Sequence, residues 1–263
     1  MPKLTRPDGV EIHYDERGEG TPVLLALGIF SGPFAFEPLI EELATDHRVI
    51  SLDPRGAGGS TRTGPYDPET DAADLEAVVE AGGEGAVIVC TANATYAAVR
   101  VGARRPELVS GVVSTGGAPI GVTTLADAAE GLAASESVRD AFIELLRNDY
   151  RGGLRAVLGD MNSQLDEAGV RERVALQADY LSHEAAVARL EAWIDDDAAT
   201  EGRELGDRLW MLNLGGNPWF SDELVVLTRK VLPEAHIEDV EDGPISRPDI
   251  AAGVVRSLSR VRT

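Results

Sequence analysis

Short apolar runs alternate with helical patterns along most of this 263-residue chain. Several of the runs are continuously apolar, as expected of strands that are buried on both faces of a sheet. Their alternation with helices predicts a parallel α/β sheet that is covered by helices. The predicted strands are 23–28, 49–53, 86–91, 110–115, 209–215 and 236–242. The predicted helices are 35–45, 67–82, 94–106, 222–231 and 248–261.

The stretch 124–204 breaks the alternation, because helical patterns follow one another there with no strand between them. Apolar residues such as Val187 and Leu190 recur in it at helical spacing, so these helices need an apolar surface to pack on. We expect a core domain formed by 1–123 and 205–263. A helical lid, inserted at 124–204, should cover the carboxyl edge of the sheet.

Charge and cysteine content restrict the surroundings of the protein. The net charge of −21 repels phosphate backbones and anionic lipid, so nucleic acid and membrane are not expected as partners. Solubility explains this acidity better than a specific basic partner does. The single cysteine, Cys90, excludes an internal disulfide, and together with the lack of a secretory signal it favours the cytoplasm. The composition leaves the oligomeric state open, a homodimer included.

Three segments, 23–60, 86–113 and 209–258, carry motifs whose order is typical of one superfamily. The second segment reads as a strand, a sharp turn, a helix and a further strand, and the third holds two more strands. The chain resembles the α/β-hydrolase superfamily, which implies a mostly parallel twisted sheet flanked by helices, with a helical lid insertion. The first segment ends in the superfamily's D-x-R-G-x-G-x-S motif, formed by Asp53, Arg55, Gly56, Gly58 and Ser60.

The turn after strand 86–91 resembles the nucleophile elbow of that superfamily. An elbow needs small residues on either side of its nucleophile, because strand and helix meet there in a sharp turn. Cys90 and Ala94 are both small, and Ala92 occupies the central position. Alanine has no hydroxyl or thiol with which to attack a carbonyl. The resemblance therefore implies an elbow whose nucleophile is absent.

The other two members of the superfamily's triad are replaced as well. Asn217 stands where an aspartate is usual, and an amide cannot stabilise an imidazolium by charge. Pro244 follows Gly243 at the position of the usual histidine, and proline cannot act as a base. Together with Ala92 these residues imply a degenerate catalytic triad. A classical serine-hydrolase mechanism is therefore not expected.

The loop after strand 23–28 should still supply an oxyanion hole. Leu27 replaces the histidine that is usual there, and Gly28 still allows a close turn of the backbone. The resemblance implies that the backbone N–H groups of Ile29 and Asn93 point into one pocket as oxyanion donors. Because these donors belong to the main chain, they can persist without a triad.

Four polar side chains are candidates for orienting a ligand or moving its protons: Thr91, Asn93, Asn217 and His183. The candidate pocket wall, which ordinary core packing explains equally well, is Leu27, Gly28, Phe30, Phe34, Tyr150, Met161 and Trp219. Structural roles are favoured for Asp53, Arg55 and Cys90, and structural or surface roles for His13, His47 and His236. The acidic runs have no histidine or cysteine at ligand spacing, so neither a metal nor a cofactor is expected.

Three functions are compatible with these residues, and the favoured one involves a small, largely apolar molecule. The favoured one is a non-hydrolytic enzyme of the lyase, cyclase or isomerase type, for example in natural-product biosynthesis, which uses the backbone oxyanion hole without a serine. A catalytically inactive small-molecule receptor or partner-binding protein is the main alternative. A hydrolase with a displaced, non-triad mechanism is the third.

Overall fold

The computed structural model describes residues 2–121, 124, 143–161, 165–194, 196–212, 222–240 and 247–260. Within them an eight-stranded sheet has the order β1-β2-β4-β3-β5-β6-β7-β8. β1 pairs with β2 and β2 with β4 in antiparallel fashion, and every other neighbouring pair is parallel. The strands are β1 (Lys3–Thr5), β2 (Glu11–Arg17), β3 (Thr21–Ala26), β4 (His47–Leu52), β5 (Ala86–Cys90), β6 (Val109–Ser114), β7 (Leu209–Leu212) and β8 (His236–Glu238).

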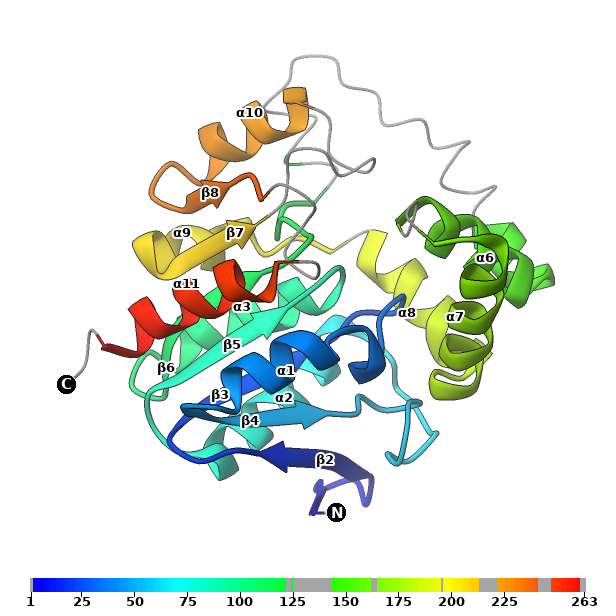
Figure 1. The fold of residues 1–263 in the computed structure, drawn as a ribbon, viewed down its shortest axis with the longest axis horizontal. Coiled ribbons are helices and arrows are strands. Elements are labelled where there is room, and N and C mark those ends of the chain that lie inside the picture. Colours follow the sequence, from blue (N-terminus) through cyan, green and yellow to red (C-terminus); the bar gives the residue numbers. More distant parts are fainter. Residues whose placement is uncertain are drawn as a thin grey trace.

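Helices cover both faces of this sheet, as Figure 1 shows. α1 (Glu37–Leu43) and α11 (Pro248–Arg260) pack side by side on one face. α2 (Pro68–Gly82), α3 (Ala94–Arg104) and α9 (Ala199–Leu205) cover the other face. α10 (Asp222–Val231) connects β7 to β8. This architecture confirms the predicted α/β-hydrolase fold.

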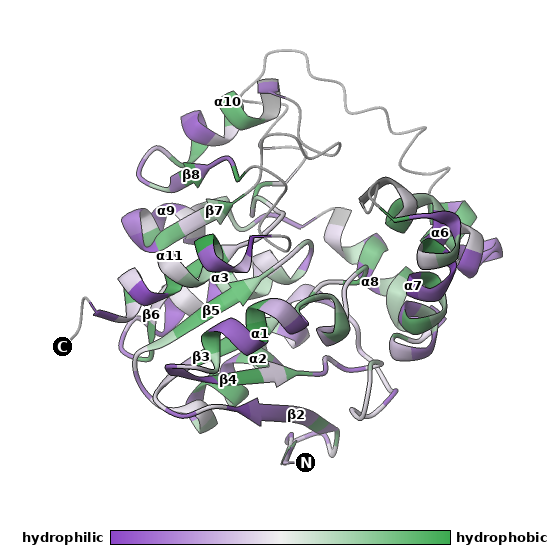
Figure 2. Cartoon of the chain, viewed as in Figure 1, coloured by the Kyte–Doolittle hydropathy of each residue, from purple (hydrophilic) through white to green (hydrophobic). Residues whose placement is uncertain are grey.

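The apolar runs of the sequence form the central strands because their side chains are buried on both sides. Every residue of β5 is buried. Val87 and Val89 belong to the cluster that contains α1 and α11, whereas Ile88 and Cys90 belong to the cluster with α2 and α3. In Figure 2 the central β5 is hydrophobic and β2 is largely hydrophilic. Alternate side chains thus supply two cores, one on each face of the sheet.

Three further helices stand beyond the carboxyl ends of the parallel strands (Figure 1). They are α6 (Tyr150–Met161), α7 (Glu167–Tyr180) and α8 (His183–Ile194). α9 lies apart from them, because its Ala199 and Leu205 belong to the core cluster around α3. The helical stretch predicted at 124–204 thus contains two kinds of helix. α6, α7 and α8 stand beyond the sheet edge, whereas α9 belongs to the layer of helices that covers one face of the sheet. The division into a core domain and a lid remains a prediction.

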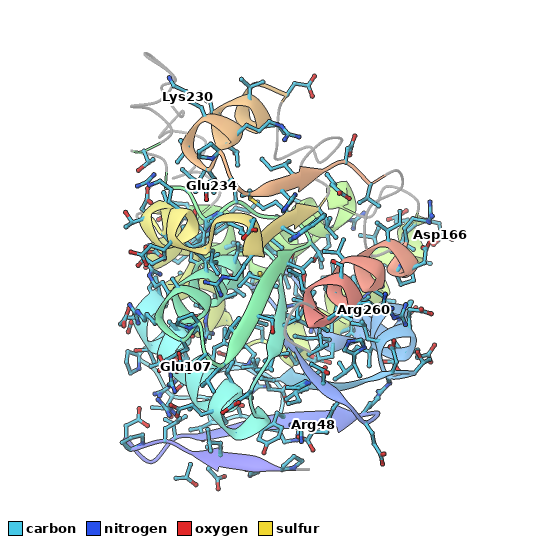
Figure 3. The ribbon with its side chains drawn as sticks, turned by 90° about the vertical axis from the view of Figure 1, so that its left-hand side faces the viewer. Arg48, Glu107, Asp166, Lys230, Glu234 and Arg260 are labelled. Carbon is cyan, nitrogen blue, oxygen red and sulfur yellow. The ribbon has the colours of Figure 1, made fainter. Side chains whose placement is uncertain are left out.

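Many charged side chains lie at the surface, as Glu107, Asp166 and Lys230 illustrate in Figure 3. None of the helices formed by the described residues is long and apolar enough to cross a membrane.

Candidate ligand site at the carboxyl edge of the sheet

The turn between β5 and α3 has the backbone of a nucleophile elbow. Ala92 has a φ of +50°, and no other non-glycine residue of the described part has a positive φ. This left-handed conformation costs an L-residue about 1–2 kcal/mol. The turn is closed by hydrogen bonds from Ala94 N to Thr91 O (3.2 Å) and from Thr95 N to Ala92 O (3.1 Å). The side chain presented at the tip is a methyl group.

Gly28 allows the loop after β3 to approach this elbow closely. A Cβ atom at Gly28 would lie 2.7 Å from Ala92 Cβ and 2.7 Å from Thr91 O. A Cβ atom essentially never makes non-bonded contacts this short, so glycine is the residue that the packing requires here. The chain also turns in this loop, where Ser31 N donates a hydrogen bond of 3.0 Å to Gly28 O.

The side chain of Asn93 accepts a hydrogen bond from one of the two expected oxyanion donors, the Ile29 N–H. Ile29 N donates a hydrogen bond of 2.9 Å to Asn93 Oδ1. Because a backbone nitrogen is a donor, the amide atom that faces it must be oxygen, so Asn93 Nδ2 lies on the other side. A substrate oxygen could use the Ile29 N–H only after the Asn93 side chain had rotated. No described residue accepts a hydrogen bond from the Asn93 N–H, the second expected donor.

A small cavity of about 40 Å³ lies beside Asn93, at the carboxyl ends of β3 and β4. A second cavity, of about 10 Å³, shares four of its lining residues, Asp71, Asn93, Ala97 and Arg189. Most of the first wall is apolar, as in small-molecule sites. Its lining residues are Ala26, Leu27, Gly28, Ile29, Leu52, Pro54, Asp71, Asp74, Leu75, Asn93, Ala94, Ala97, Tyr180, Leu181 and Arg189.

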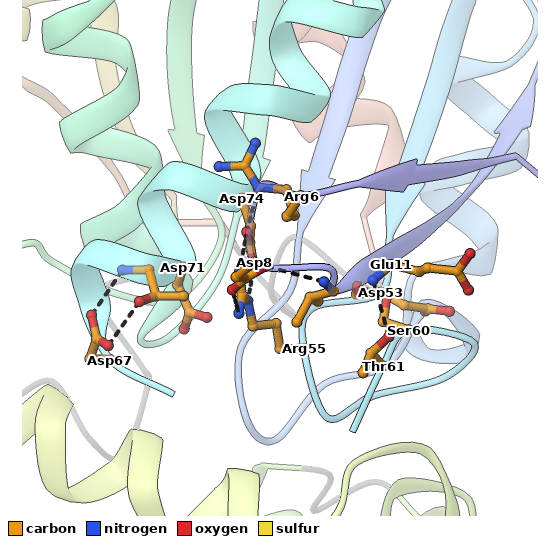
Figure 4. Close-up of polar contacts among 12 residues, drawn as sticks. Arg6, Asp8, Glu11, Asp53, Arg55, Ser60, Thr61, Asp67, Asp71 and Asp74 are labelled. Carbon is orange, nitrogen blue, oxygen red and sulfur yellow. Dashed lines mark hydrogen bonds and ion pairs between the residues drawn. The ribbon is translucent and has the colours of Figure 1, made fainter. Parts of the chain in front are cut away.

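The charged groups of the first cavity are neutralised by one another. Arg189 donates to both oxygens of Asp71, at 2.7 Å each, and to the backbone oxygen of Arg55. Asp74 accepts hydrogen bonds from Arg55 (2.6 and 3.0 Å) and from Arg6 (2.9 Å), as Figure 4 shows. Because both carboxylates are held in ion pairs, neither is free to act as a general base.

Asp53 and Arg55 hold the loop of the D-x-R-G-x-G-x-S motif in place. Asp53 accepts hydrogen bonds from Gly59 N (2.9 Å) and from the hydroxyl of Tyr180 (2.9 Å), and it lies 2.7 Å from Nδ1 of His13. Burial, and then the charge of Asp53, raise the pKa of Tyr180 well above its ordinary value. Tyr180 is thus a protonated donor. These contacts agree with the structural roles expected for Asp53, Arg55 and His13.

Cys90 and Thr91, whose side chains could in principle act as nucleophiles near the elbow, are both buried. Cys90 is fully buried, and burial raises the pKa of its thiol to about 12. Thr91 is 4% exposed, and no histidine or carboxylate of the described residues hydrogen-bonds to its hydroxyl. Neither residue therefore has an activating base in the described part of the chain.

His183 lies among the helices beyond the sheet edge and lines neither cavity. Its Nε2 is 2.8 Å from Leu146 O, and its ring stacks on that of Tyr150 with a centroid distance of 4.9 Å. The catalytic role expected for His183 would require a different placement of this ring.

The expected pocket residues divide into two groups. Leu27, Gly28, Ile29 and Asn93 line the first cavity. The aromatic candidates Phe30, Phe34 and Tyr150 instead contact the helices beyond the sheet edge. Asn217, Trp219, Pro244 and the side chain of Met161 lie outside the described residues, so their predicted roles stay predictions.

Sequence reasoning missed Asp71, Asp74, Tyr180 and Arg189 as site residues. Asp71 and Asp74 lie in the first turns of α2, where acidic residues are common because they favour the helix dipole. Their arginine partners are distant in sequence, so no local signal marked the pairs. In the described residues there is also no cluster of histidine, cysteine or carboxylate side chains that could hold a metal ion.

A family model described as the α/β-hydrolase fold matches residues 21–163. Among curated proteins, RutD of Azorhizobium caulinodans, which bears the provisional name of a carbamate hydrolase, is 39% identical over 74 residues. That match spans 28% of this chain and 28% of the relative.

Solved structures resemble the whole chain. The esterase EaEST from Exiguobacterium antarcticum has a TM-score of 0.83 at 18% identity and covers 98% of both chains. MGS-M2, an α/β-hydrolase enzyme from a Medee basin deep-sea metagenome library, has a TM-score of 0.78 at 12% identity. Its match covers 98% of this chain and 96% of that one. At such low identities the likeness shows the fold alone.

Proposed function

The chain belongs to the α/β-hydrolase fold family, and on that premise we propose that it binds a small, largely apolar molecule without forming an acyl-enzyme. The proposal rests on the side chains of two adjacent residues at the elbow, Ala92 and Asn93. Ala92 has the nucleophile's backbone conformation without a hydroxyl, and Asn93 Oδ1 accepts the hydrogen bond of the Ile29 N–H. Acyl transfer needs a nucleophile and an accessible oxyanion hole, and this arrangement disfavours both.

The cavity supports non-covalent binding rather than chemistry. Its wall is mostly apolar, and each of its described carboxylates and guanidinium groups is engaged in an ion pair. Proton transfer needs a group within hydrogen-bonding reach that is free to gain or lose a proton. We therefore favour a small-molecule receptor.

Ligand binding and ester turnover, measured on the same protein, test this function. We expect neutral aromatic fragments to raise the unfolding temperature, and p-nitrophenyl acetate to be hydrolysed no faster than by heat-unfolded protein. Ala97, which lines both cavities, provides a variant: Ala97→Leu should weaken fragment binding at least about tenfold, which is about 1.4 kcal/mol. Ala81→Leu adds the same bulk at an exposed position of α2 and should change nothing. Saturable ester turnover by the folded protein would overturn the proposal.

A non-hydrolytic enzyme of the lyase, cyclase or isomerase type is the second candidate. It is favoured by the strained φ of Ala92, since backbone strain concentrates at functional sites. It is also favoured by the Asn93 N–H, which has no acceptor among the described residues and could stabilise an enolate oxygen. Mass spectrometry of a bound molecule after incubation separates the candidates. A receptor returns the molecule unchanged, whereas an enzyme converts it.

A further inference from the structure

Neither cavity at the carboxyl edge of the sheet is large enough for an aromatic molecule as it stands. The first encloses about 40 Å³ and the second about 10 Å³. A cavity needs about 10–15 Å³ to hold one water molecule, whereas an apolar cavity of about 150 Å³ binds benzene. A ligand of the proposed kind therefore requires a side chain of the cavity wall to move.

The wall that the two cavities share contains one side chain that is held weakly. Four residues line both cavities: Asp71, Asn93, Ala97 and Arg189. Asp71 and Arg189 are joined by two hydrogen bonds of 2.7 Å, and the methyl group of Ala97 has no rotamers. Asn93 is partly exposed, and among the described residues its side chain makes one hydrogen bond, to Ile29 N. Asn93 is thus the shared residue that a ligand can displace most easily.

The side chain of Asn93 does not cap the helix that it precedes. Asparagine in this position usually caps a helix with its side-chain oxygen. At α3 that bond is missing, and Asn93 Oδ1 instead accepts from Ile29 N at 2.9 Å. The same oxygen lies 2.8 Å from the point where a Cβ atom of Gly28 would stand. It therefore lies against two residues that line the first cavity, Gly28 and Ile29.

We propose that the Asn93 side chain is a gate, a group that must move before a ligand can bind, and that a neutral ligand displaces it with a carbonyl oxygen. The ligand oxygen takes the position of Asn93 Oδ1, which is 2.9 Å from Ile29 N, so one hydrogen bond replaces another. The displacement also enlarges the first cavity. This inference rests on the proposed binding function and adds its ligand class and its gate.

Two features of the site select such a ligand. Ile29 is only 2% exposed, so a ligand without an acceptor would leave its N–H buried and unpaired, which is costly. The charged groups of the cavity wall are already joined in ion pairs and need no counter-ion from the ligand. A neutral molecule with one carbonyl group satisfies both conditions.

Two probes of nearly equal shape test the choice of ligand. Acetophenone carries a carbonyl group, and α-methylstyrene has a methylene group in place of the oxygen. We expect acetophenone to bind at least about tenfold more tightly, which is about 1.4 kcal/mol. In amide spectra of protein labelled at isoleucine, the Ile29 signal, assigned with Ile29→Val, should respond differently to the two probes. Equal affinities, or an Ile29 signal that neither probe moves, overturn the inference.

Asn93→Ala removes the gate. The ligand then has no hydrogen bond to break, so acetophenone affinity should rise at least about tenfold. Leu181→Ala is the matched control, because it also enlarges the first cavity but leaves the bond between Asn93 and Ile29 in place. An equal or larger gain in Leu181→Ala would mean that cavity volume alone limits binding, and it overturns the inference.

Asn93→Asp should keep the gate closed. Aspartate has the shape of asparagine, and its charged oxygen accepts more strongly from Ile29 N. Acetophenone affinity at pH 8 should therefore fall at least about tenfold. Asn148→Asp makes the same charge change at an exposed amide and should leave the affinity intact. Because the alanine and aspartate variants should change affinity in opposite directions, loss of folding cannot imitate the result. Changes in the same direction overturn the inference.

Failure of the proposed function has a different signature. If neither probe binds to the wild type or to Asn93→Ala, or if the folded protein turns over esters, the binding function is contradicted and the gate with it. If both probes bind and their affinities are the same in every Asn93 variant, the binding function stands and the gate alone is overturned.

Discussion

Arg189 of α8 donates two hydrogen bonds of 2.7 Å to Asp71 of α2, although the two residues are 118 positions apart in the chain. The side chains are only 3% and 16% exposed, and the guanidinium also lies over the ring of Tyr66, 5.2 Å from its centroid. Burial by itself lowers the pKa of Arg189, yet the Asp71 carboxylate raises it overall, so the pair stays ionised. This ion pair connects α8, which stands beyond the sheet edge, to α2, which covers one face of the sheet. Both residues of the pair line both cavities.

Breaking this ion pair should destabilise the fold strongly. Arg189→Met leaves Asp71 as a largely buried charge without a partner, so the free energy of unfolding should fall by about 3–5 kcal/mol. Chemical denaturation measures it. Adding Asp71→Leu should recover part of the loss, because the unpaired charge is then gone. Arg147→Met, which breaks an exposed pair with Glu191, is the control and should cost at most about 1 kcal/mol. Equal losses in the two arginine variants would refute this account.

Gly28→Ala should destabilise the protein through a clash with the elbow. The added methyl would lie 2.7 Å from Ala92 Cβ, and such overpacking costs about 1–3 kcal/mol. Gly253→Ala in α11 is the matched control, because nothing lies within 4 Å of a Cβ there. Alanine favours a helix over glycine by about 1 kcal/mol, so this control should be neutral or stabilising. Thermal unfolding compares the two, and a stable Gly28→Ala protein would contradict the packing described.

Cys90 should be unreactive while the protein is folded. Burial raises the pKa of its thiol to about 12, so the thiolate, which is the reactive form, is scarce between pH 7 and 9. Iodoacetamide at pH 8 should leave the native protein unmodified and alkylate its single cysteine in guanidinium chloride. Equal rates of alkylation in the two states would show that Cys90 is accessible.

The contact between Asp46 and Arg256 should make stability depend on acid pH. Hydrogen bonding to Arg256 holds the pKa of the Asp46 carboxyl at about 2, below its ordinary value of about 3.9. A pKa lowered by folding stabilises the native state above pH 4, and this stabilisation is lost as the pH falls through 2.

The Asp46→Asn variant measures that contribution. Asp46 has 45% of its side chain exposed, so the loss at pH 7 should be about 1 kcal/mol or less. Urea denaturation between pH 7 and pH 2.5 should show the difference from wild type shrinking as acid is added. A difference that stays constant with pH would mean that the carboxylate charge is not its source.

The sheet could be predicted because its signal is local. The run 86–91 is continuously apolar, and β5 occupies Ala86–Cys90 with both faces buried. α9 shows the limit of such patterns. The insertion predicted at 124–204 includes Ala199, which packs with Leu205 in the cluster around α3. An amphipathic helical pattern indicates that one face of the helix is buried, but it does not indicate which part of the protein that face packs against.

The candidate site was predictable in its backbone and not in its side-chain contacts. Small residues around Ala92 indicated an elbow, which Ala92 forms with its positive φ. The bond between Asn93 Oδ1 and Ile29 N joins residues 64 positions apart, so only the folded chain brings them together. The same holds for the partners of Asp71 and for the stacking of His183 on Tyr150.

The proposed absence of acyl chemistry is tested most directly by the intact mass of the protein after incubation with a fluorophosphonate. We expect an unmodified mass for the wild type, because Ala92 presents a methyl group at the elbow. We expect the same for Ala92→Ser, because none of the described histidines has a hydrogen bond or ring contact with a residue of the elbow. A single phosphonylated residue in the wild-type protein, formed at a rate that saturates with reagent, would contradict the account.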